Sequence, residues 1–491
     1  MAKAFLSLLF ITVIFFSSCN RSNKDHQIIP GNVLAMVGGK IITVNDFIKR
    51  CEYVPRPNYC RGDNYIHKKI ALNSLIAEKL FAMEFENRDL LFTKNQMMVI
   101  RGQKEQTMRQ LMLKQFGFEK VKIDTVQIRK LSNLINREYK ISFISLDKKY
   151  KNVFSNLPNN TRLKDIVLKT DNNIEIEQKL ITKNDNMIEQ VMEILFYGNQ
   201  NLNFLYGPYE VHNNALFCFE INGWTTRPKI TENEKKDSWN QAIKNYSESE
   251  AKKYYGKYVS QLLKDKSIEY KPDVFSLFSN KLSKIYLVEK NKKKAVIENR
   301  MWEKNNEIEI ATFDDIKKME NSIILTHDNR TYKISELLTM IKKHPLVFRN
   351  KTINPDKFSN ELKYAIADLF RDFHITNEAY RLGLDQNVLV THNKNKWEDY
   401  IKSINLNKPL GRKFMTNRIP SDKQIILTDS LQIKYSRVIK IDMDKFEKIK
   451  LSKTDMSVMY SNQPYAKVEP NFPIITNDHI IDYGKNVHFF D

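Results

Sequence analysis

Hydrophobic and polar positions form a short hairpin-and-helix pattern near the start of the chain. Apolar residues 33–36 predict a strand, the pair Gly38-Gly39 a tight turn, and residues 40–44 the returning strand. The side chain of Thr43 or Asn45 is suited to cap a short helix that follows. The pattern therefore predicts a strand, a turn, a second strand and a helix in sequence.

The same pattern returns 290 residues later with few identical residues. Residues 323–325 and 330–334 predict the paired strands, and Asp328-Asn329 predicts the turn between them. Ser335 is the expected cap of the next helix. Because the apolar positions fall in register, we interpret the two stretches as copies of one unit. A chance match between two ordinary helical hairpins is the alternative.

A longer amphipathic helix is predicted in each copy. Pro55 and Pro345 end the short helices. Apolar residues spaced by three and four then line one helix face, namely Leu72, Ile76, Leu80 and Met83 in the first copy and Leu362, Ile366, Phe370 and Phe373 in the second.

The segments between and after the two copies have different patterns. Thr231 and Glu234 match a capping box that opens a long helix. Near the end of the chain, residues 431–435 and 439–443 alternate apolar and polar side chains, which predicts half-buried strands. The chain is therefore expected to be an α+β multidomain protein with a small β-rich C-terminal module.

The first 19 residues predict a lipoprotein signal peptide. An apolar run of 12 residues, Phe5 to Phe16, follows Lys3 and is too short to span a bilayer. Residues 16–19 resemble a bacterial lipoprotein box, which implies lipid attachment at Cys19. An ordinary secretory signal cut near Ser18 is the alternative.

The lipoprotein box also implies a location. A polar tether over residues 20–30 would hold the chain at the periplasmic side of a membrane. Asn20 differs from the aspartate that marks inner-membrane retention, so the resemblance favours the outer membrane.

Size and charge narrow the classes of function. A chain of 491 residues suggests about three or four domains, and a hydrophobic content of 42% is typical of globular proteins. The net charge is +21, but the Lys and Arg residues are scattered and form no dense basic block. We therefore expect no nucleic-acid partner and attribute the charge to composition.

Catalytic motifs are missing from the sequence. There is no His-x-x-x-His pair, no Cys-x-x-Cys pair and no phosphate-binding glycine loop. We predict no catalytic residue, no metal ligand and no cofactor, and we assign His327 and His344 to capping or solvent-exposed positions. Cys51 and Cys60 are a candidate disulfide, because a secreted chain reaches an oxidising compartment.

Methionine and aromatic residues on the predicted helices are candidates for contacting unfolded proteins. Methionine is flexible and polarisable, and Tyr and Trp combine an apolar body with a polar tip. Packing within a core is the alternative for each of them. The candidate client-contact residues are Met83, Met97, Met98, Met108, Met112, Trp239, Tyr246 and Tyr254.

The first copy resembles the start of the SurA-type and parvulin-type (PpiC-like) periplasmic foldases. Residues 37–47 are similar to the hairpin and cap of that family, and residues 71–85 to its long helix. Residues 139–146 resemble the first strand of its parvulin prolyl isomerase domain, and residues 207–221 its closing hairpin.

The family's catalytic features are missing from this parvulin-like region. No histidine occurs in residues 139–146, and Ala215 or Leu216 stands at the second histidine position. The glycine-rich stretch of the family is also missing from residues 150–206. The resemblance therefore implies a degenerate parvulin-like domain that retains peptide binding.

The resemblance implies helical chaperone arms around this domain. The expected organisation is a signal peptide at 1–19, a tether at 20–30, an N-terminal helical chaperone domain at 31–136, a degenerate parvulin-like domain at 137–228, a helical connector at 229–310, the second helical copy at 311–408 and the β-rich module at 409–491.

This organisation implies a lipoprotein chaperone for unfolded exported or outer-membrane proteins. It would act without a cofactor, and its oligomeric state is left open. Two alternatives are an active peptidyl-prolyl cis-trans isomerase and a non-catalytic assembly lipoprotein that docks one fixed partner.

Overall fold

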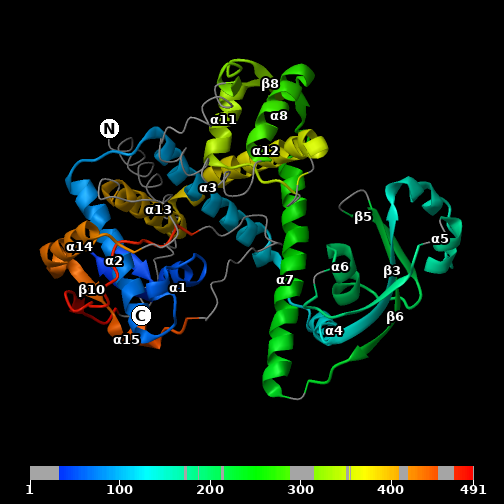
Figure 1. Ribbon diagram of the computed structural model, residues 1–491, viewed down its shortest axis with the longest axis horizontal. Helices are drawn as coiled ribbons and strands as arrows, with labels where there is room; N and C mark the ends of the chain where they lie inside the picture. Colours follow the sequence, from blue (N-terminus) through cyan, green and yellow to red (C-terminus); the bar gives the residue numbers. More distant parts are fainter. Residues whose placement is uncertain are drawn as a thin grey trace, which may run out of the picture. The chain divides into compact units, whose positions relative to one another are not determined.

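The computed structural model describes residues 32–170, 174–185, 187–211, 215–229, 231–287, 315–349, 353, 355–407, 419–451 and 469–489. The described residues form a mixed α+β structure with three small sheets, in two compact units (Figure 1). Unit 1 takes the described residues of Met1–Met112 and Leu262–Asp491, and unit 2 is Leu113–Gln261. The predicted signal peptide, Cys19 and the tether lie outside the described residues. Within the described part, no helix combines the length and apolar character needed to cross a membrane.

The first copy has the predicted order of elements. Its members are β1 (Val33–Val37), β2 (Lys40–Thr43), α1 (Val44–Glu52), α2 (Tyr65–Asn87) and α3 (Lys94–Phe116). Gly38 has a φ of 61°, a left-handed conformation that suits glycine in a tight turn. Of the two predicted caps, Thr43 is the one used, because its hydroxyl accepts the backbone N–H of Asp46 at 3.0 Å.

The second copy repeats this order. Its members are β8 (Ile323–His327), β9 (Arg330–Lys333), α11 (Ile334–Lys343), α12 (Phe358–Arg381) and α13 (Val388–Asn407). Asp328 and Asn329 both have positive φ, as a two-residue hairpin turn requires. The predicted cap was wrong: the helix begins at Ile334, so Ser335 lies inside its first turn, and the Glu336 carboxylate accepts the N–H of Lys333 instead.

A third strand completes the sheet of each copy at the same register. β10 (Ile439–Ile441) pairs antiparallel with β1, placing Ile439 opposite Val37. β7 (Ile268–Tyr270) pairs antiparallel with β8, placing Ile268 opposite His327. Val37 and His327 are 290 positions apart, so the third strands occupy equivalent places. In the first sheet, β11 (Lys485–Asn486) adds in parallel to β10.

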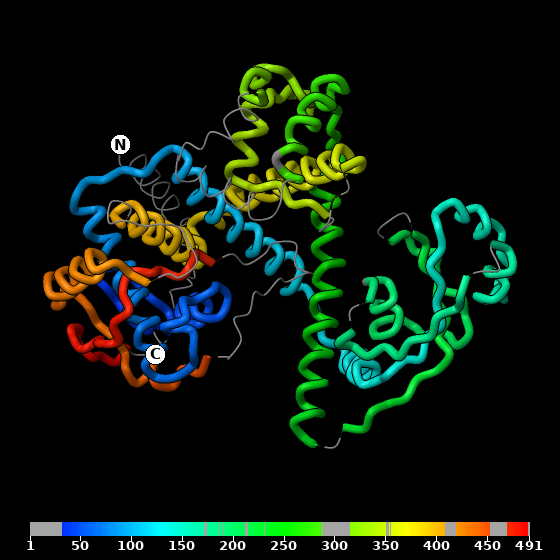
Figure 2. Tube along the Cα trace, viewed as in Figure 1, coloured from blue at the N-terminus to red at the C-terminus, as the bar shows by residue number. Residues whose placement is uncertain are grey.

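The C-terminal segment differs from its prediction. Residues 431–435 end helix α14 (Asp422–Tyr435) and do not form a strand, whereas 439–441 is a strand as predicted and α15 (Met443–Lys448) follows it. In α14, Gln424, Thr428 and Leu431 are buried at helical spacing. The segment is not a separate β-rich module, because β10 and residues such as Phe472 and Ile475 belong to the core of the first copy. Figure 2 shows the orange and red C-terminal chain beside the blue N-terminal chain.

The two copies pack together within unit 1 through their third helices. Helix α13 of the second copy packs along α2 of the first. Helix α3 of the first copy contacts α12 of the second, where Nη1 of Arg109 donates to the Thr376 hydroxyl at 2.8 Å. The third helix of each copy therefore packs against the other copy. A separate core in the second copy joins α8 (Pro272–Tyr286) to β8, α11 and α12.

Unit 2 contains a four-stranded antiparallel sheet in the order β4-β3-β6-β5. Its elements are α4 (Thr125–Leu134), β3 (Arg137–Asp147), α5 (Leu163–Lys169), β4 (Glu177–Ile181), α6 (Glu189–Tyr197), β5 (Leu205–Val211), β6 (Ala215–Thr226) and α7 (Glu232–Leu262). Strands are therefore present where a first strand and a closing hairpin were predicted, at 139–146 and 207–221. The predicted capping box of Thr231 and Glu234 is also formed.

Candidate functional site

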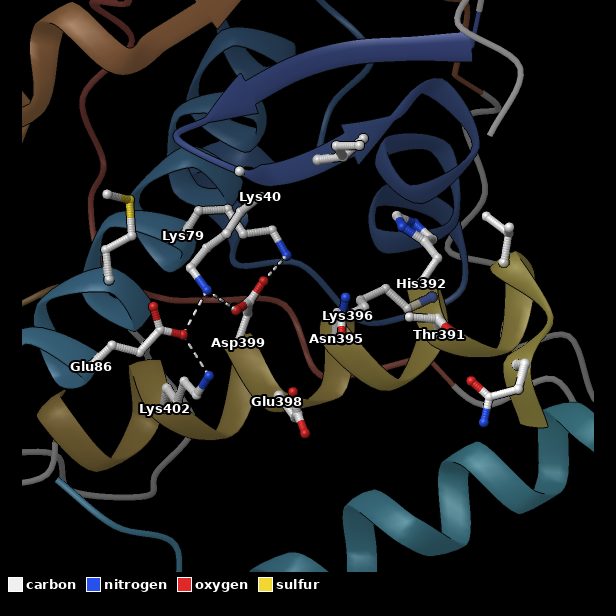
Figure 3. A pocket seen from close by; sticks show the side chains of 15 residues that line it. Lys40, Lys79, Glu86, Thr391, His392, Asn395, Lys396, Glu398, Asp399 and Lys402 are labelled. Atoms are coloured by element: carbon white, nitrogen blue, oxygen red, sulfur yellow. Dashed lines mark hydrogen bonds and ion pairs between the residues drawn. The ribbon is translucent and has the colours of Figure 1, made fainter. Parts of the chain in front are cut away.

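A cavity of about 580 Å³ lies in unit 1 between the β1–β2 turn, α2 and α13 (Figure 3). Most of its lining comes from the second copy, namely α13 and Gln386, and the rest comes from the first. The ionisable residues in its wall are Lys40, Lys79, Glu86, His392, Lys396, Glu398, Asp399 and Lys402. The cavity is thus a charged space at the joint between the copies.

Asp399 is the centre of one ion-pair network in this wall. Its carboxylate oxygens accept from the ammonium groups of Lys40 at 2.8 Å and Lys79 at 2.9 Å. Glu86 accepts from Lys40 and from Lys402 (Figure 3). Burial disfavours the charged forms, but the opposite charges outweigh it, so the pKa of Lys40 is raised and that of Asp399 is lowered. Lys40 is therefore a protonated ammonium and a poor nucleophile.

Asp46 is the centre of a second network. Its carboxylate accepts from the Thr43 hydroxyl at 2.6 Å and from Nε2 of His392 at 2.7 Å, while the Lys396 ammonium lies 3.6 Å away and also pairs with Glu469. Burial favours the protonated acid, but His392 and Lys396 hold the pKa of Asp46 well below its usual range. One carboxylate thus caps α1 and fastens α13 to it.

The charged residues of the cavity wall favour a structural role, which is to join the two copies. Each Lys, Asp and Glu of the wall is in an ion pair, Glu398 with Lys394, and His392 is hydrogen-bonded to Asp46. General acid–base or nucleophilic catalysis needs a group that titrates near neutral pH or is otherwise activated. The carboxylates that anchor this wall have lowered pKa values and Lys40 has a raised one, so the arrangement favours holding α13 in place.

Six aromatic rings form a continuous stack on one face of the sheet in unit 2. We call this set the aromatic ladder: Phe143, Phe204, Tyr206, Tyr209, Phe217 and Phe219. Neighbouring ring centroids are 4.9 to 6.4 Å apart, within the range of favourable ring–ring contacts. The ladder spans β3, β6 and β5.

The rings at the ends of the ladder are the exposed ones. Helix α6 covers the other part of the same sheet face, where its Phe196 packs edge-on against Tyr139. Phe204 is 43% exposed, and Phe143 and Tyr209 are partly exposed. The opposite face of the sheet holds Cys218, whose pKa is raised to about 12 by burial, so this thiol is not activated. The terminal rings present apolar surface, and the described part of unit 2 places no activated thiol beside them.

The structure separates the predicted client-contact residues. Met97 is 53% exposed and Tyr254 is 40% exposed, and Met98 is partly exposed. Met108 and Met112 are fully buried in α3, so they are core residues and present no surface to a client. The remaining three have packing roles: Met83 lines the charged cavity, and Trp239 and Tyr246 pack α7 against α4.

The candidate disulfide is not formed in the structure. Cys51 and Cys60 are separate, fully buried thiols, and burial raises the pKa of each to about 12. The expectation was wrong for His327, whereas His344 lies at the C-cap of α11, as expected. His327 is only 4% exposed, and Nε2 of His344 lies 2.7 Å from the carboxylate of Asp372.

Sequence reasoning missed both the charged networks and the aromatic ladder. The partners that join the two copies are hundreds of residues apart, as are Lys79 and Asp399, and no local pattern connects them. The ladder had a local signal, since residues 204–219 contain five aromatic side chains on two neighbouring strands. That density of rings on alternate strand positions is typical of a sheet face.

Comparisons of this chain with protein-family models, with curated proteins and with solved structures find no significant match. Most ionisable groups of the cavity are held by partners across the joint, whereas the ladder exposes apolar rings at its ends. Of the two, the ladder is the better candidate for binding another molecule.

Proposed function

We propose that this protein is a periplasmic lipoprotein chaperone that holds unfolded exported or outer-membrane proteins, and that the aromatic ladder of unit 2 contacts them. The observation that carries the proposal is the exposure of the terminal rings of the ladder, Phe143, Phe204 and Tyr209, each of which contacts one of the three inner rings. Holding a client in this way requires no ATP, metal or nucleophile.

The ladder suits clients of varied sequence. Aromatic rings bury a large apolar area and accept many side-chain shapes, so affinity does not depend on one motif. Precursors of outer-membrane barrels expose alternating apolar side chains and unpaired strand edges before they close. Strand β4 lies at the edge of the same sheet, and its Leu180 is 56% exposed, so an extended segment can add beside it.

Unit 1 has the role of a scaffold in this proposal. Its two copies are joined by exchanged helices and by the charged networks around Asp399 and Asp46. The similarity of residues 37–47 and 71–85 to SurA-type foldases supports a role in folding exported proteins. The isomerase alternative has less support, because the sequence of unit 2 contains a single histidine, His212, which lies outside the described residues.

Aggregation of a client tests the proposal. A urea-unfolded outer-membrane barrel protein is diluted with and without the chain from Asn20 onward, and light scattering is followed. We expect the wild-type chain to suppress scattering at a near-equimolar ratio. The double variant Phe204→Ala/Tyr209→Ala should lose most of this effect, because it removes two outer rings of the ladder.

Tyr254→Ala is the matched control. Tyr254 lies in the same unit and is exposed to a similar degree as Phe204, but it is on α7 and outside the ladder. It should retain suppression, and thermal unfolding should confirm that both variants fold. Failure of the wild-type chain to suppress scattering would favour the docking alternative. Loss of suppression in Tyr254→Ala alone would move the client site to α7.

A further inference from the structure

Two histidines and an aspartate meet in the second copy, away from the charged cavity. His327 ends β8, Asp328 opens the turn, and His374 lies on α12. The Nε2 atoms of the histidines are 2.7 Å apart, and Oδ2 of Asp328 is 3.9 Å from each of them. Three side chains that commonly bind metals therefore place their donor atoms within 4.8 Å of one another.

The hydrogen bond made by one ring nitrogen of His327 shows which nitrogen is left to bind a metal. Its Nδ1 is 2.7 Å from the carbonyl oxygen of Ser267. A carbonyl only accepts, so Nδ1 carries a proton, and Nε2 faces His374. A histidine that binds a metal usually donates its other N–H to a backbone carbonyl in this way. The ring of Phe370, with its centroid 4.7 Å from that of His327, packs against the imidazole.

The duplication shows that the fold does not require these residues. At the equivalent positions the first copy has Val37, Gly38 and Glu84, each 290 residues earlier. Val37 pairs with its third strand in the same register as His327 does. The hairpin therefore forms in the first copy without a histidine pair, so the shared backbone fold does not account for the cluster.

We propose that His327, Asp328 and His374 bind a divalent transition-metal ion of the zinc class, with the remaining coordination positions open to water. Imidazole nitrogens favour such ions over Mg²⁺ and Ca²⁺, which prefer oxygen ligands. Zn–N bonds of about 2.0–2.1 Å place two ligand nitrogens roughly 3.3 Å apart in a tetrahedral site. To reach this spacing, Nε2 of His374 has to move away from Nε2 of His327 by about 0.6 Å. The Asp328 carboxylate has to move closer to Nε2 of His327 by about 0.6 Å.

Two further features fit the binding of a cation. Burial and the neighbouring His327 lower the pKa of His374, which keeps its imidazole in the neutral form that binds metals. The ammonium of Lys266 lies 2.6 Å from Asp328 and supplies the positive charge that a metal ion would replace. Lys266 is partly exposed, so it can turn to solvent when the ion binds. The ion would tie the second hairpin to α12.

Calorimetric titration of the full-length protein in detergent, after removal of metals with EDTA, tests the site. With zinc chloride we expect one ion per chain. Loss of a residue that only hydrogen-bonds to a metal ligand weakens metal binding by roughly 10–100-fold. His374→Gln removes a ligand itself, so it should weaken zinc binding by more than this. His479→Gln is the matched control, because His479 lies on an exposed part of the same unit, and it should bind as the wild type does.

A second variant separates binding from folding. Asp328→Asn keeps a residue that tolerates positive φ, so the turn is preserved while the charged ligand is lost. With cobalt in place of zinc, the wild type should show visible absorption typical of a low-symmetry site, and Asp328→Asn and His374→Gln should not. The proposal is overturned if the wild type binds no zinc, or if folded His374→Gln and Asp328→Asn bind it with wild-type affinity. This test does not depend on the proposed chaperone function.

Discussion

The two copies of the hairpin-and-helix unit have the same backbone order but are completed in different ways. The second copy takes its third strand from Ile268–Tyr270, which comes before β8 in the chain and is separated from it by α8. The first takes Ile439–Ile441, about 400 residues after Val37. The first copy therefore cannot complete its sheet until nearly the whole chain is present. Closing such a long loop costs little stability, but it slows folding.

The copies also differ in what they bury. In the first, Arg50 and Glu78 form an ion pair at 2.6 Å, with each side chain only 1% exposed. At the equivalent positions the second copy has Met340 and Asp368, and Asp368 pairs with arginines near the surface. A buried ion pair is costly to break and adds little net stability, whereas an apolar side chain in a core needs no charged partner. The comparison predicts unequal responses to equivalent substitutions.

The largest difference is expected for the buried ion pair. Glu78→Ala leaves the Arg50 guanidinium buried without this carboxylate and should lower the free energy of unfolding by about 3–5 kcal/mol. Asp368→Ala, at the equivalent position, should cost about 0–1 kcal/mol because its pairs are partly exposed. Urea denaturation measures both. Equal losses would show that the pair is not the source of the asymmetry.

The packing of α3 on the second copy depends on Gly102. A Cβ at this position would lie 2.0 Å from the carbonyl oxygen of Lys343, so Gly102→Ala has to push α3 away from α11. We expect a loss of roughly 2 kcal/mol, in the range of overpacked sites. Gly256 lies in the interior of α7 with nothing near a built Cβ, so Gly256→Ala should stabilise the protein by up to about 1 kcal/mol.

Thermal unfolding of the two glycine variants gives opposite shifts if the close approach of α3 is real. A stabilising Gly102→Ala would show that the two copies are not in contact at this point.

Acid should loosen the joint between the copies. Burial opposes the charge on Asp399, but Lys79 and Lys40 lower its pKa, and the pKa of Asp372 at the other joint is lowered as well. The unfolded chain therefore binds protons at higher pH than the folded one. The stability from these carboxylates is complete above about pH 5 and is lost as the pH falls through their folded pKa values.

Urea midpoints at pH 7, 5 and 3 measure this acid effect. Asp399→Asn should be less stable than the wild type at pH 7 but lose less stability between pH 5 and pH 3. Parallel losses in the two proteins would exclude Asp399 as a source of acid sensitivity.

The smallest effect concerns the caps of the short helices. Thr43 caps α1 with its hydroxyl, whereas Lys333 at the equivalent position gives α11 no side-chain cap. Thr43→Ala should cost about 1 kcal/mol, and Lys333→Thr should stabilise by a similar or smaller amount. Chemical denaturation checks both. A neutral Lys333→Thr would mean that Glu336, which binds the N–H of Lys333, already satisfies the helix end.

Local signals predicted the two hairpins and much of the secondary structure. The turn at Gly38, the cap at Thr43 and the capping box at Thr231 each depend on neighbouring residues. The local sequence is therefore sufficient to predict them. Residues 431–435 were predicted wrongly as a strand, because five alternating residues also fit the end of an amphipathic helix. Leu431 packs in the core of the first copy, and this packing favours helix α14 over a strand.

The sequence by itself determined that the hairpin-and-helix unit occurs twice, because its turns, caps and apolar spacings are local and are repeated at a fixed offset. Only the tertiary structure decided how the copies are completed and joined. The pairing of Val37 with Ile439, the ion pair of Lys79 with Asp399 and the burial of Met108 depend on residues far along the chain. Hydrogen bonds and charges act across space, so a linear pattern does not identify these partners.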